Sequence, residues 1–134
     1  MAEIYYTSGE FARKAHVTLR TLRYYDKENL LHPSARTPGG ARLYTNEDLV
    51  RLQQILLFKY FGFSLSEIRE LSLASTDASV LLQSMRIQRR LLSERAEEIR
   101  EMQTAMDETI QMMEEGSRIE WSSMLDLIHL TSME

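Results

Sequence analysis

The sequence of 134 residues predicts a mainly α-helical fold: a head of short helices with one small β-hairpin, followed by a long coiled-coil helix. Three observations support this prediction. Helix-capping patterns recur along the first half of the chain. Both prolines and a Gly-Gly pair lie within residues 33–40, which predicts one turn-rich interruption. Residues 77–115 contain neither glycine nor proline, which favours one long helix.

Length and composition restrict the class of protein. A chain of this size suits one compact domain plus an extension. It has no cysteine, so disulfides and thiolate metal sites are excluded. We find neither a signal peptide nor an apolar run long enough to span a bilayer, and we therefore expect a cytoplasmic protein without a membrane partner.

Charge is divided unequally along the chain. Residues 1–63 contain nine Lys/Arg and six Asp/Glu, a balance of +3, whereas residues 64–134 contain seven and fourteen, a balance of −7. The sum is the net charge of −4. This asymmetry suggests an anion-binding head on an acidic body.

The first two helices are predicted from their start signals. Thr7 and Glu10 fit a capping box, and Thr18 can cap a second helix after the short link His16-Val17. Two short helices joined in this way are typical of a helix-turn-helix, whose second helix enters the major groove of DNA.

The second helix has two different faces. At 100° per residue, Arg20, Arg23, Tyr24 and Lys27 share one arc, and the leucines at 19, 22 and 30 lie on another. The cationic and aromatic arc is either an ordinary solvated surface or a surface for an anionic ligand, and its neighbours in the chain have to decide.

Residues 32–45 favour the second alternative. Pro38-Gly39-Gly40 reads as a turn, and the segments 34–36 and 42–44 on either side each contain an arginine. A small β-hairpin with Arg36 and Arg42 is a wing. Wings beside a recognition helix lie along the sugar-phosphate backbone, where cations are useful.

Two further helices and a long one complete the chain. Thr45 to Asp48 and Ser64 to Glu67 are start signals, and Gly62 can end the first of these helices. In the long helix a row of apolar side chains recurs every seventh residue, and a second row is broken and retains Met102. Such rows predict a homodimer through a coiled coil. The dimerisation residues are expected to be Met85, Leu92, Ile99, Met102, Met106 and Met113.

These signals predict three regions: a winged helix-turn-helix domain over residues 1–75, the dimerisation helix over 76–116, and a short amphipathic helix over 117–134. The only tryptophan, Trp121, is expected either to pack against the long helix or to face a ligand.

Three motifs in the first half of the chain resemble those of a known protein family. The run RTLRYYD at Arg20–Asp26, the Leu-Leu-x-Pro of residues 30–33 and the Arg-Leu-Tyr of residues 42–44 resemble the MerR family of bacterial transcription regulators. The resemblance covers roughly half the chain in sequence detail. It implies an antiparallel homodimer that binds a pseudo-palindromic promoter spacer and distorts the DNA, so that RNA polymerase is engaged indirectly.

The resemblance also implies individual DNA contacts. Matching positions are base- or phosphate-contacting in the family, and the helical arc and the wing add Lys27 and Arg36. Tyr25 falls outside the arc and is expected to be partly core. The predicted DNA-binding residues are Thr18, Arg20, Arg23, Tyr24, Tyr25, Lys27, Arg36, Arg42 and Tyr44.

Cofactors are not expected. The family's metal sensors use cysteines that this chain lacks, and its three histidines, at 16, 32 and 129, have no ligand spacing. A small-molecule effector is not identified: the chain is either a short regulator or one that has lost its sensor domain. We expect the distorted DNA state to form without an effector.

The sequence fits two other function classes, an enzyme and an interaction module, less well. An enzyme is disfavoured because the sequence has no phosphate-binding glycine loop, nucleophile motif or cluster of His with carboxylates. A coiled-coil interaction module, whose basic head binds an acidic protein, is the stronger alternative. A steep salt dependence and a preference for duplex DNA would separate the two.

Overall fold

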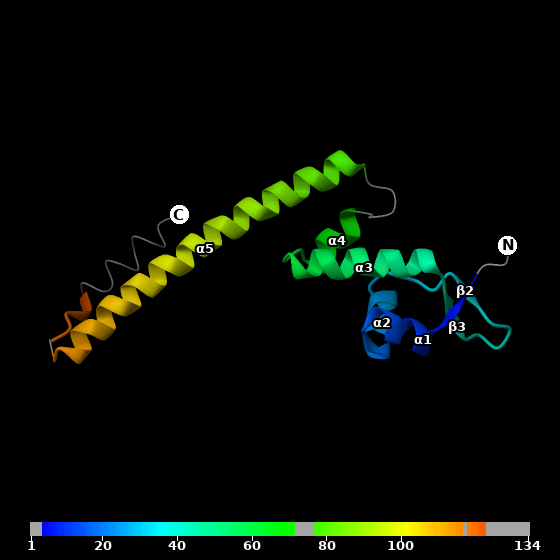
Figure 1. Cartoon of the computed structure of the whole chain (residues 1–134), viewed down its shortest axis with the longest axis horizontal. Helices are drawn as coiled ribbons and strands as arrows, with labels where there is room; N and C mark the ends of the chain where they lie inside the picture. Colours follow the sequence, from blue (N-terminus) through cyan, green and yellow to red (C-terminus); the bar gives the residue numbers. More distant parts are fainter. Residues whose placement is uncertain (1–3, 72–76, 117, 123–134) are drawn as a thin grey trace. The chain divides into compact units, whose positions relative to one another are not determined.

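The computed structural model describes residues 4–71, 77–116 and 118–122 of the chain. The chain divides into two compact units, residues 1–88 and residues 89–134. The first unit, called the head below, contains the sheet, four short helices and the beginning of a fifth (Figure 1). The second contains the remainder of that long helix.

The small sheet has three strands in the order β1-β3-β2, all antiparallel. The predicted hairpin is present as β2 (Ala35–Arg36) and β3 (Arg42–Tyr44). Its turn is closed by a hydrogen bond from the Gly40 amide to the Thr37 carbonyl, 2.8 Å. Gly40 has a φ of 89°, which explains the glycine there. The strand β1 (Tyr6–Thr7), which pairs with β3, was not predicted because two residues carry no alternation signal.

The helix-turn-helix begins where its capping residues predict. Thr7 caps α1 (Ser8–Ala15), and its side chain and that of Glu10 form the reciprocal hydrogen bonds of a capping box. His16, in the left-handed conformation at φ 58°, ends α1. Thr18 then caps α2 (Leu19–Lys27) by accepting a hydrogen bond from the Thr21 amide.

The next two helices also follow their caps. Thr45 and Asp48 form the capping box of α3 (Asn46–Tyr60), and Ser64 caps α4 (Leu65–Leu71) together with Glu67. In Figure 1, α3 lies between α4 on one side and α1 and α2 on the other. The buried side of α3 therefore supplies the centre of the head, through Leu52, Ile55 and Phe58.

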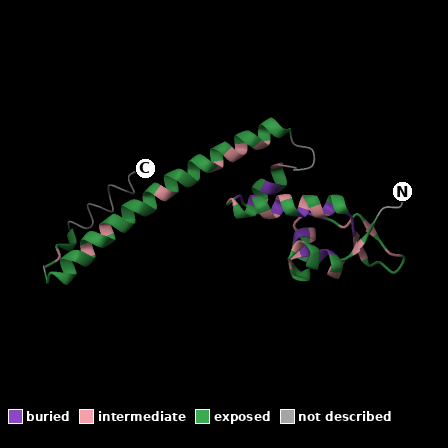
Figure 2. Cartoon of the chain, viewed as in Figure 1, coloured by how far each residue is buried: buried purple, intermediate pink, exposed green. Residues whose placement is uncertain are grey.

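A hydrophobic core joins the four short helices of the head to β3 (Figure 2). The rings of Phe11 in α1 and Tyr44 in β3 stack at its centre, with centroids 4.4 Å apart and planes within 7°. Phe58 and Phe63 form an edge contact at 5.0 Å. Aromatic pairs of this kind stabilise a core beyond their area burial. The wing is therefore built onto the helices through Tyr44.

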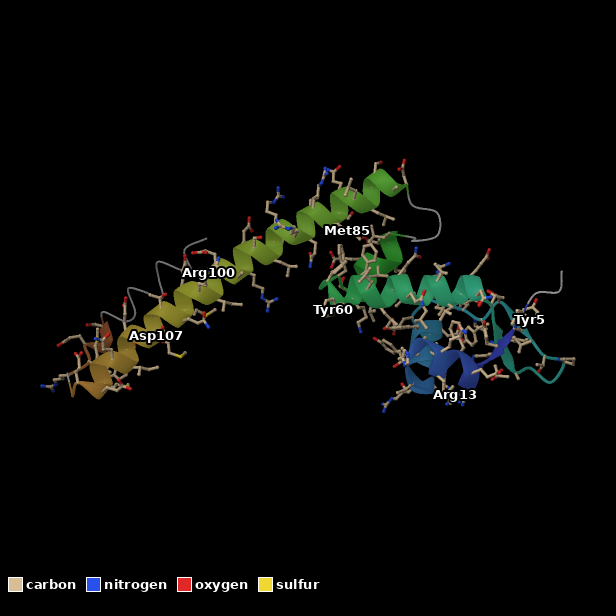
Figure 3. The ribbon with its side chains drawn as sticks, viewed as in Figure 1. Tyr5, Arg13, Tyr60, Met85, Arg100 and Asp107 are labelled. Carbon is tan, nitrogen blue, oxygen red and sulfur yellow. The ribbon has the colours of Figure 1, made fainter. Side chains whose placement is uncertain are left out.

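The long helix α5 (Ala78–Glu114) begins against the head. Leu81 and Met85 pack on the core of the head, and Met85 is labelled in Figure 3. The Gln88 side-chain amide donates a hydrogen bond to the Phe61 carbonyl, 2.9 Å. Gln88 is one of three polar residues that break the second heptad row, and this contact gives it a structural role. The start of α5 thus belongs to the same compact unit as the head, residues 1–88.

Beyond Gln88 the helix has a different character. None of the α5 residues is buried, and Figure 2 shows no buried position along it. The apolar side chains of its distal part are 37–63% exposed: Leu91, Leu92, Ile99, Met102, Met106, Ile110, Met112 and Met113. Among the described residues, no helix is long and apolar enough to cross a membrane.

The predicted C-terminal helix over residues 117–134 lies mostly outside the described residues. Within them, Trp121 is 64% exposed.

Candidate nucleic-acid interface

The outward side of α2 gathers the cationic arc predicted from the sequence. Arg20, Arg23, Tyr24 and Lys27 are all exposed. The opposite side holds α2 in the head through Leu22 and Tyr25, each 2% exposed. Leu19, expected in the apolar seam, is instead 42% exposed. The helix is thus anchored by one face and offers three cations and a phenol on the other.

The turn before α2 fixes how that face is presented. The Val17 amide donates to the Ala12 carbonyl at 3.0 Å, which closes the link between α1 and α2. The Thr18 hydroxyl lies 3.0 Å from the Thr21 hydroxyl as well as capping the helix. Thr18 is exposed at the N-terminal end of α2, where amides and a hydroxyl are suited to a phosphate group.

The wing adds two cations. Arg36 and Arg42 are directly opposite each other in the β2–β3 register. Arg36 is exposed, and its Nη1 donates to the Gly40 carbonyl at 3.1 Å, so its side chain follows the wing toward the turn. Arg42 is about one-third exposed, and its Nε lies 3.3 Å from Oδ2 of Asp26 in α2. The wing and the recognition helix are therefore linked by an ion pair.

Two predicted DNA contacts lie in the core. Tyr25 and Tyr44 are 2% and 1% exposed, and burial raises the pKa of both phenols. Around Tyr44, Asp26 and Asp48 also raise the pKa, and Arg42 and Arg36 oppose them. The resemblance assigned both positions to DNA, whereas the structure makes their rings supports of α2 and the wing. The 100° spacing of α2 separates Tyr25 from the exposed arc and predicts that it is partly core, whereas no sequence pattern indicates that Tyr44 is buried.

The structure also brings forward a cation that the sequence reasoning missed. Lys59, in the last turn of α3, places its Nζ 6.0 Å from the centre of the Tyr25 ring. The next residue, Tyr60, is 86% exposed (labelled in Figure 3). The basic residue at the helix end was visible in the sequence, but its position beside α2 depends on how α3 crosses the head.

Of the predicted dimerisation residues, Met85 packs against the head, and the other five lie in the distal helix. No group of three or more His, Asp or Glu side chains in the described part of the chain is arranged to hold a metal ion. The sites gathered by the fold are therefore a basic surface on the head and an exposed apolar surface on α5.

Comparison with known proteins identifies the family. Residues 6–74 match the model of the MerR helix-turn-helix regulatory proteins, and residues 49–115 match the MerR DNA-binding model. The chain belongs to the MerR family. These matches confirm the resemblance found in the motifs of α2 and the wing.

Several curated proteins that this chain is similar to are named as transcriptional regulators or activators. The HTH-type transcriptional activator mta of Bacillus subtilis is 41% identical over 112 residues, which is 83% of this chain and 42% of mta. The regulator ZntR of Escherichia coli is 50% identical over 66 residues, or 49% of this chain and 47% of ZntR. The chain thus spans less than half the length of these curated relatives.

Solved structures agree on the fold. A MerR-family regulator from Bacillus cereus superposes with a TM-score of 0.72 at 40% identity, over 95% of this chain and 96% of that chain. HiNmlR, described as a MerR family regulator lacking the sensor domain and bound to promoter DNA, gives a TM-score of 0.58 at 25% identity, over 85% and 97% of the two chains. The predicted fold of a winged helix-turn-helix head and a long helix is confirmed.

Proposed function

We propose that this protein is a transcription regulator that binds promoter DNA as a homodimer and acts by distorting the promoter spacer. The observation that carries the proposal is the basic surface of the head, in which exposed cations of α2 stand beside the wing arginines. Support comes from family membership and from HiNmlR, whose structure contains promoter DNA.

Within the head, the residues have two different tasks. Arg20, Arg23 and Tyr24, on the outward arc of α2, are suited to the major groove, where arginine reads guanine through O6 and N7. Thr18, Lys27 and Lys59 lie at the ends of helices, and Arg36 and Arg42 lie on the wing. We assign these five to phosphates, which orient the protein without reading sequence.

A homodimer follows from the exposed apolar row of α5. A helix that stood alone would keep Leu92, Ile99 and Met106 in water, at about 0.8 kcal/mol for each methylene that could be buried. Seven-residue spacing is the pattern that a partner helix covers. We propose an antiparallel pair, which gives the dimer two recognition helices and two wings.

Distortion of the DNA follows from the paired heads. Four basic elements on one duplex contact the backbone on both sides of a pseudo-palindrome. These contacts can offset a deformation of the central base pairs, which costs about 1–6 kcal/mol for moderate bending. Bending or untwisting there changes the angle between the promoter elements on either side. RNA polymerase is then affected through the DNA, in the cytoplasm where the promoter lies.

Transcription in vitro tests the proposal. Genomic fragments retained by the protein are first searched for an inverted repeat, and the promoter found is rebuilt with its spacer changed one base pair at a time. We expect stimulation, with no effector added, only where the spacer is overlong, and repression at the optimal length. Equal stimulation at every length would contradict the distortion model and favour recruitment of polymerase.

The alternative, a coiled-coil module whose basic head binds an acidic protein, predicts a different competition result. Poly-glutamate should then displace DNA from the head at equal charge concentration. A DNA-binding head should instead prefer duplex DNA and lose affinity steeply with salt. We propose no catalytic activity, since the relatives named above are regulators.

A further inference from the structure

Asp26 lies where the recognition helix, the wing and the loop between them meet. It is in the last turn of α2, and its side chain is 18% exposed. One carboxylate oxygen, Oδ1, is paired with Nδ1 of His32 in the loop after the helix. The other, Oδ2, lies 3.3 Å from Nε of Arg42 at the start of β3. A single carboxylate thus connects three segments.

A carboxylate at this position opposes DNA binding by its charge alone. Asp26 belongs to a helix whose exposed arc is formed by arginine, lysine and tyrosine. A negative charge there reduces the attraction to phosphates and lowers the affinity. Electrostatics alone therefore predicts that neutralising Asp26 strengthens DNA binding.

The geometry at Arg42 predicts the opposite. Its Nε is buried and has no hydrogen-bond partner within the described part of the chain, and Asp26 is its acidic partner. Nε is the guanidinium nitrogen nearest the main chain. An ion pair at Nε fixes the direction of the side chain and leaves the terminal nitrogens, at its far end, for a second anion. A side chain fixed in advance loses less conformational freedom when it binds.

We propose that Asp26 is a positioning residue for DNA binding: its carboxylate holds the Arg42 side chain in the orientation in which it binds a phosphate. This inference rests on the proposed DNA-binding function and deepens it. The role needs both carboxylate oxygens, since one accepts from His32 and the other faces Arg42. An asparagine offers one acceptor oxygen and turns an N–H₂ group toward one of two donors.

Other contacts hold the wing to other parts of the head: Tyr44 of β3 stacks on Phe11 of α1, and β3 pairs with β1. The Ser34 hydroxyl, just before β2, donates to Oδ2 of Asp48 at 2.7 Å, and Asp48 belongs to the capping box of α3. That bond ties β2 to α3. The Asp26–Arg42 pair is what ties β3 to α2, so it sets the wing cation relative to the helix that enters the groove.

A double-mutant cycle tests the proposal with the full chain and a fluorescein-labelled duplex of mixed sequence, titrated over a series of salt concentrations. Asp26→Asn should weaken binding about three- to tenfold. It should also lower the salt slope by ~0.9 per subunit, as Arg42→Ala does, because one phosphate contact is lost. In the Arg42→Ala background, Asp26→Asn should cause no further loss.

Glu70→Gln is the matched control, since Glu70 is an exposed carboxylate on α4 whose removal changes the charge equally. It should leave binding unchanged or slightly stronger. Asp26→Glu keeps the charge but moves the carboxylate, and it should weaken binding in an Arg42-dependent way. This second variant decides the question if Asp26→Asn fails to fold by circular dichroism.

The proposal is overturned if Asp26→Asn strengthens binding as Glu70→Gln does, or if its effect adds to that of Arg42→Ala. A lowered melting temperature with an unchanged salt slope would also contradict it, since that result describes a structural residue only. Failure of the wild-type chain to bind the duplex would instead contradict the proposed function, so the two outcomes are distinguishable.

Discussion

The head and the distal part of α5 bury their apolar residues to opposite degrees. The head encloses twelve buried hydrophobic residues. Three of these, Phe11, Tyr44 and Leu52, are at most 1% exposed. The large apolar side chains of the distal helix, by contrast, are each at least 37% exposed. The head satisfies its hydrophobic side chains within one chain. The distal helix has the pattern of a surface that requires a second chain.

The same contrast is visible in charge. The head presents its cations on α2 and the wing, whereas residues 89–134 have five basic and eleven acidic residues. Duplex DNA, with one charge for about every 1.7 Å of helix axis, attracts the first and repels the second. In the proposed function, DNA binding and dimerisation thus belong to separate parts of the chain, and each proposal can be tested by substitution.

The largest expected effect is on the dimer. Ile99→Asp places a charge in the centre of the apolar row and should destabilise the dimer by several kcal/mol. Thr104→Asp adds the same charge on the opposite side of the helix, about 140° from Ile99, and should leave the dimer intact. Sedimentation equilibrium of both variants measures the change, and circular dichroism should show that the head remains folded. A dimer that tolerates Ile99→Asp would contradict the role given to this helix.

The next effect is on the head. Phe11→Ala removes the ring that stacks on Tyr44 and should lower the free energy of unfolding by about 3–5 kcal/mol. Chemical denaturation monitored by far-UV circular dichroism measures this change.

Tyr44→Phe keeps the ring and removes only the hydroxyl, so DNA affinity should be unchanged if Tyr44 acts through its packing. A clear loss of affinity in Tyr44→Phe would restore Tyr44 to the DNA contacts.

A smaller effect should separate base recognition from phosphate contact within the head. Arg23→Ala should cost about 1–3 kcal/mol on the cognate site and reduce discrimination at particular base pairs. Arg42→Ala should weaken binding to all sequences alike and reduce the salt slope by about one unit per subunit. Binding isotherms on cognate and scrambled duplexes distinguish the two. Weakening confined to the cognate duplex in Arg42→Ala would contradict the assignment of the wing to phosphates.

The smallest effect is in the pH dependence of stability. The Thr7 amide and then its hydroxyl hold the pKa of Glu10 below its ordinary value of 4.5. A lowered folded-state pKa contributes stability that is present above pH 4.5 and is lost as the pH falls through the lower value. Glu10→Gln should therefore melt at a lower temperature than wild type near neutral pH, and the difference should shrink in acid. A difference that does not depend on pH would contradict a role for the carboxylate.

Local signals were enough to predict most of the head. Thr7, Thr18 and Thr45 cap the helices that they were expected to cap, and Pro38-Gly39-Gly40 forms the expected turn, because caps and turns depend on a few neighbouring residues. What could not be predicted depends on contacts between distant segments. The burial of Tyr44, the pairing of Asp26 with Arg42 and the position of Lys59 beside α2 all follow from tertiary packing.

The heptad rows show a further limit of sequence patterns. Met85 and Ile99 belong to one row with a spacing of seven, yet Met85 packs on the head and Ile99 is exposed. A period reports that one side of a helix is apolar and does not report which surface covers it. Gln88 interrupts the second apolar row, and its side-chain amide donates a hydrogen bond to the Phe61 carbonyl.

The mass of the wild-type protein in solution tests the central claim most directly. Light scattering at micromolar concentration should give the mass of two chains of 15.7 kDa each for the free protein, and the mass of two chains plus one duplex when it is bound to DNA containing one inverted repeat. A single chain in solution that binds DNA with full affinity would contradict the account, because the exposed row of α5 would then have no partner and the paired heads would not exist.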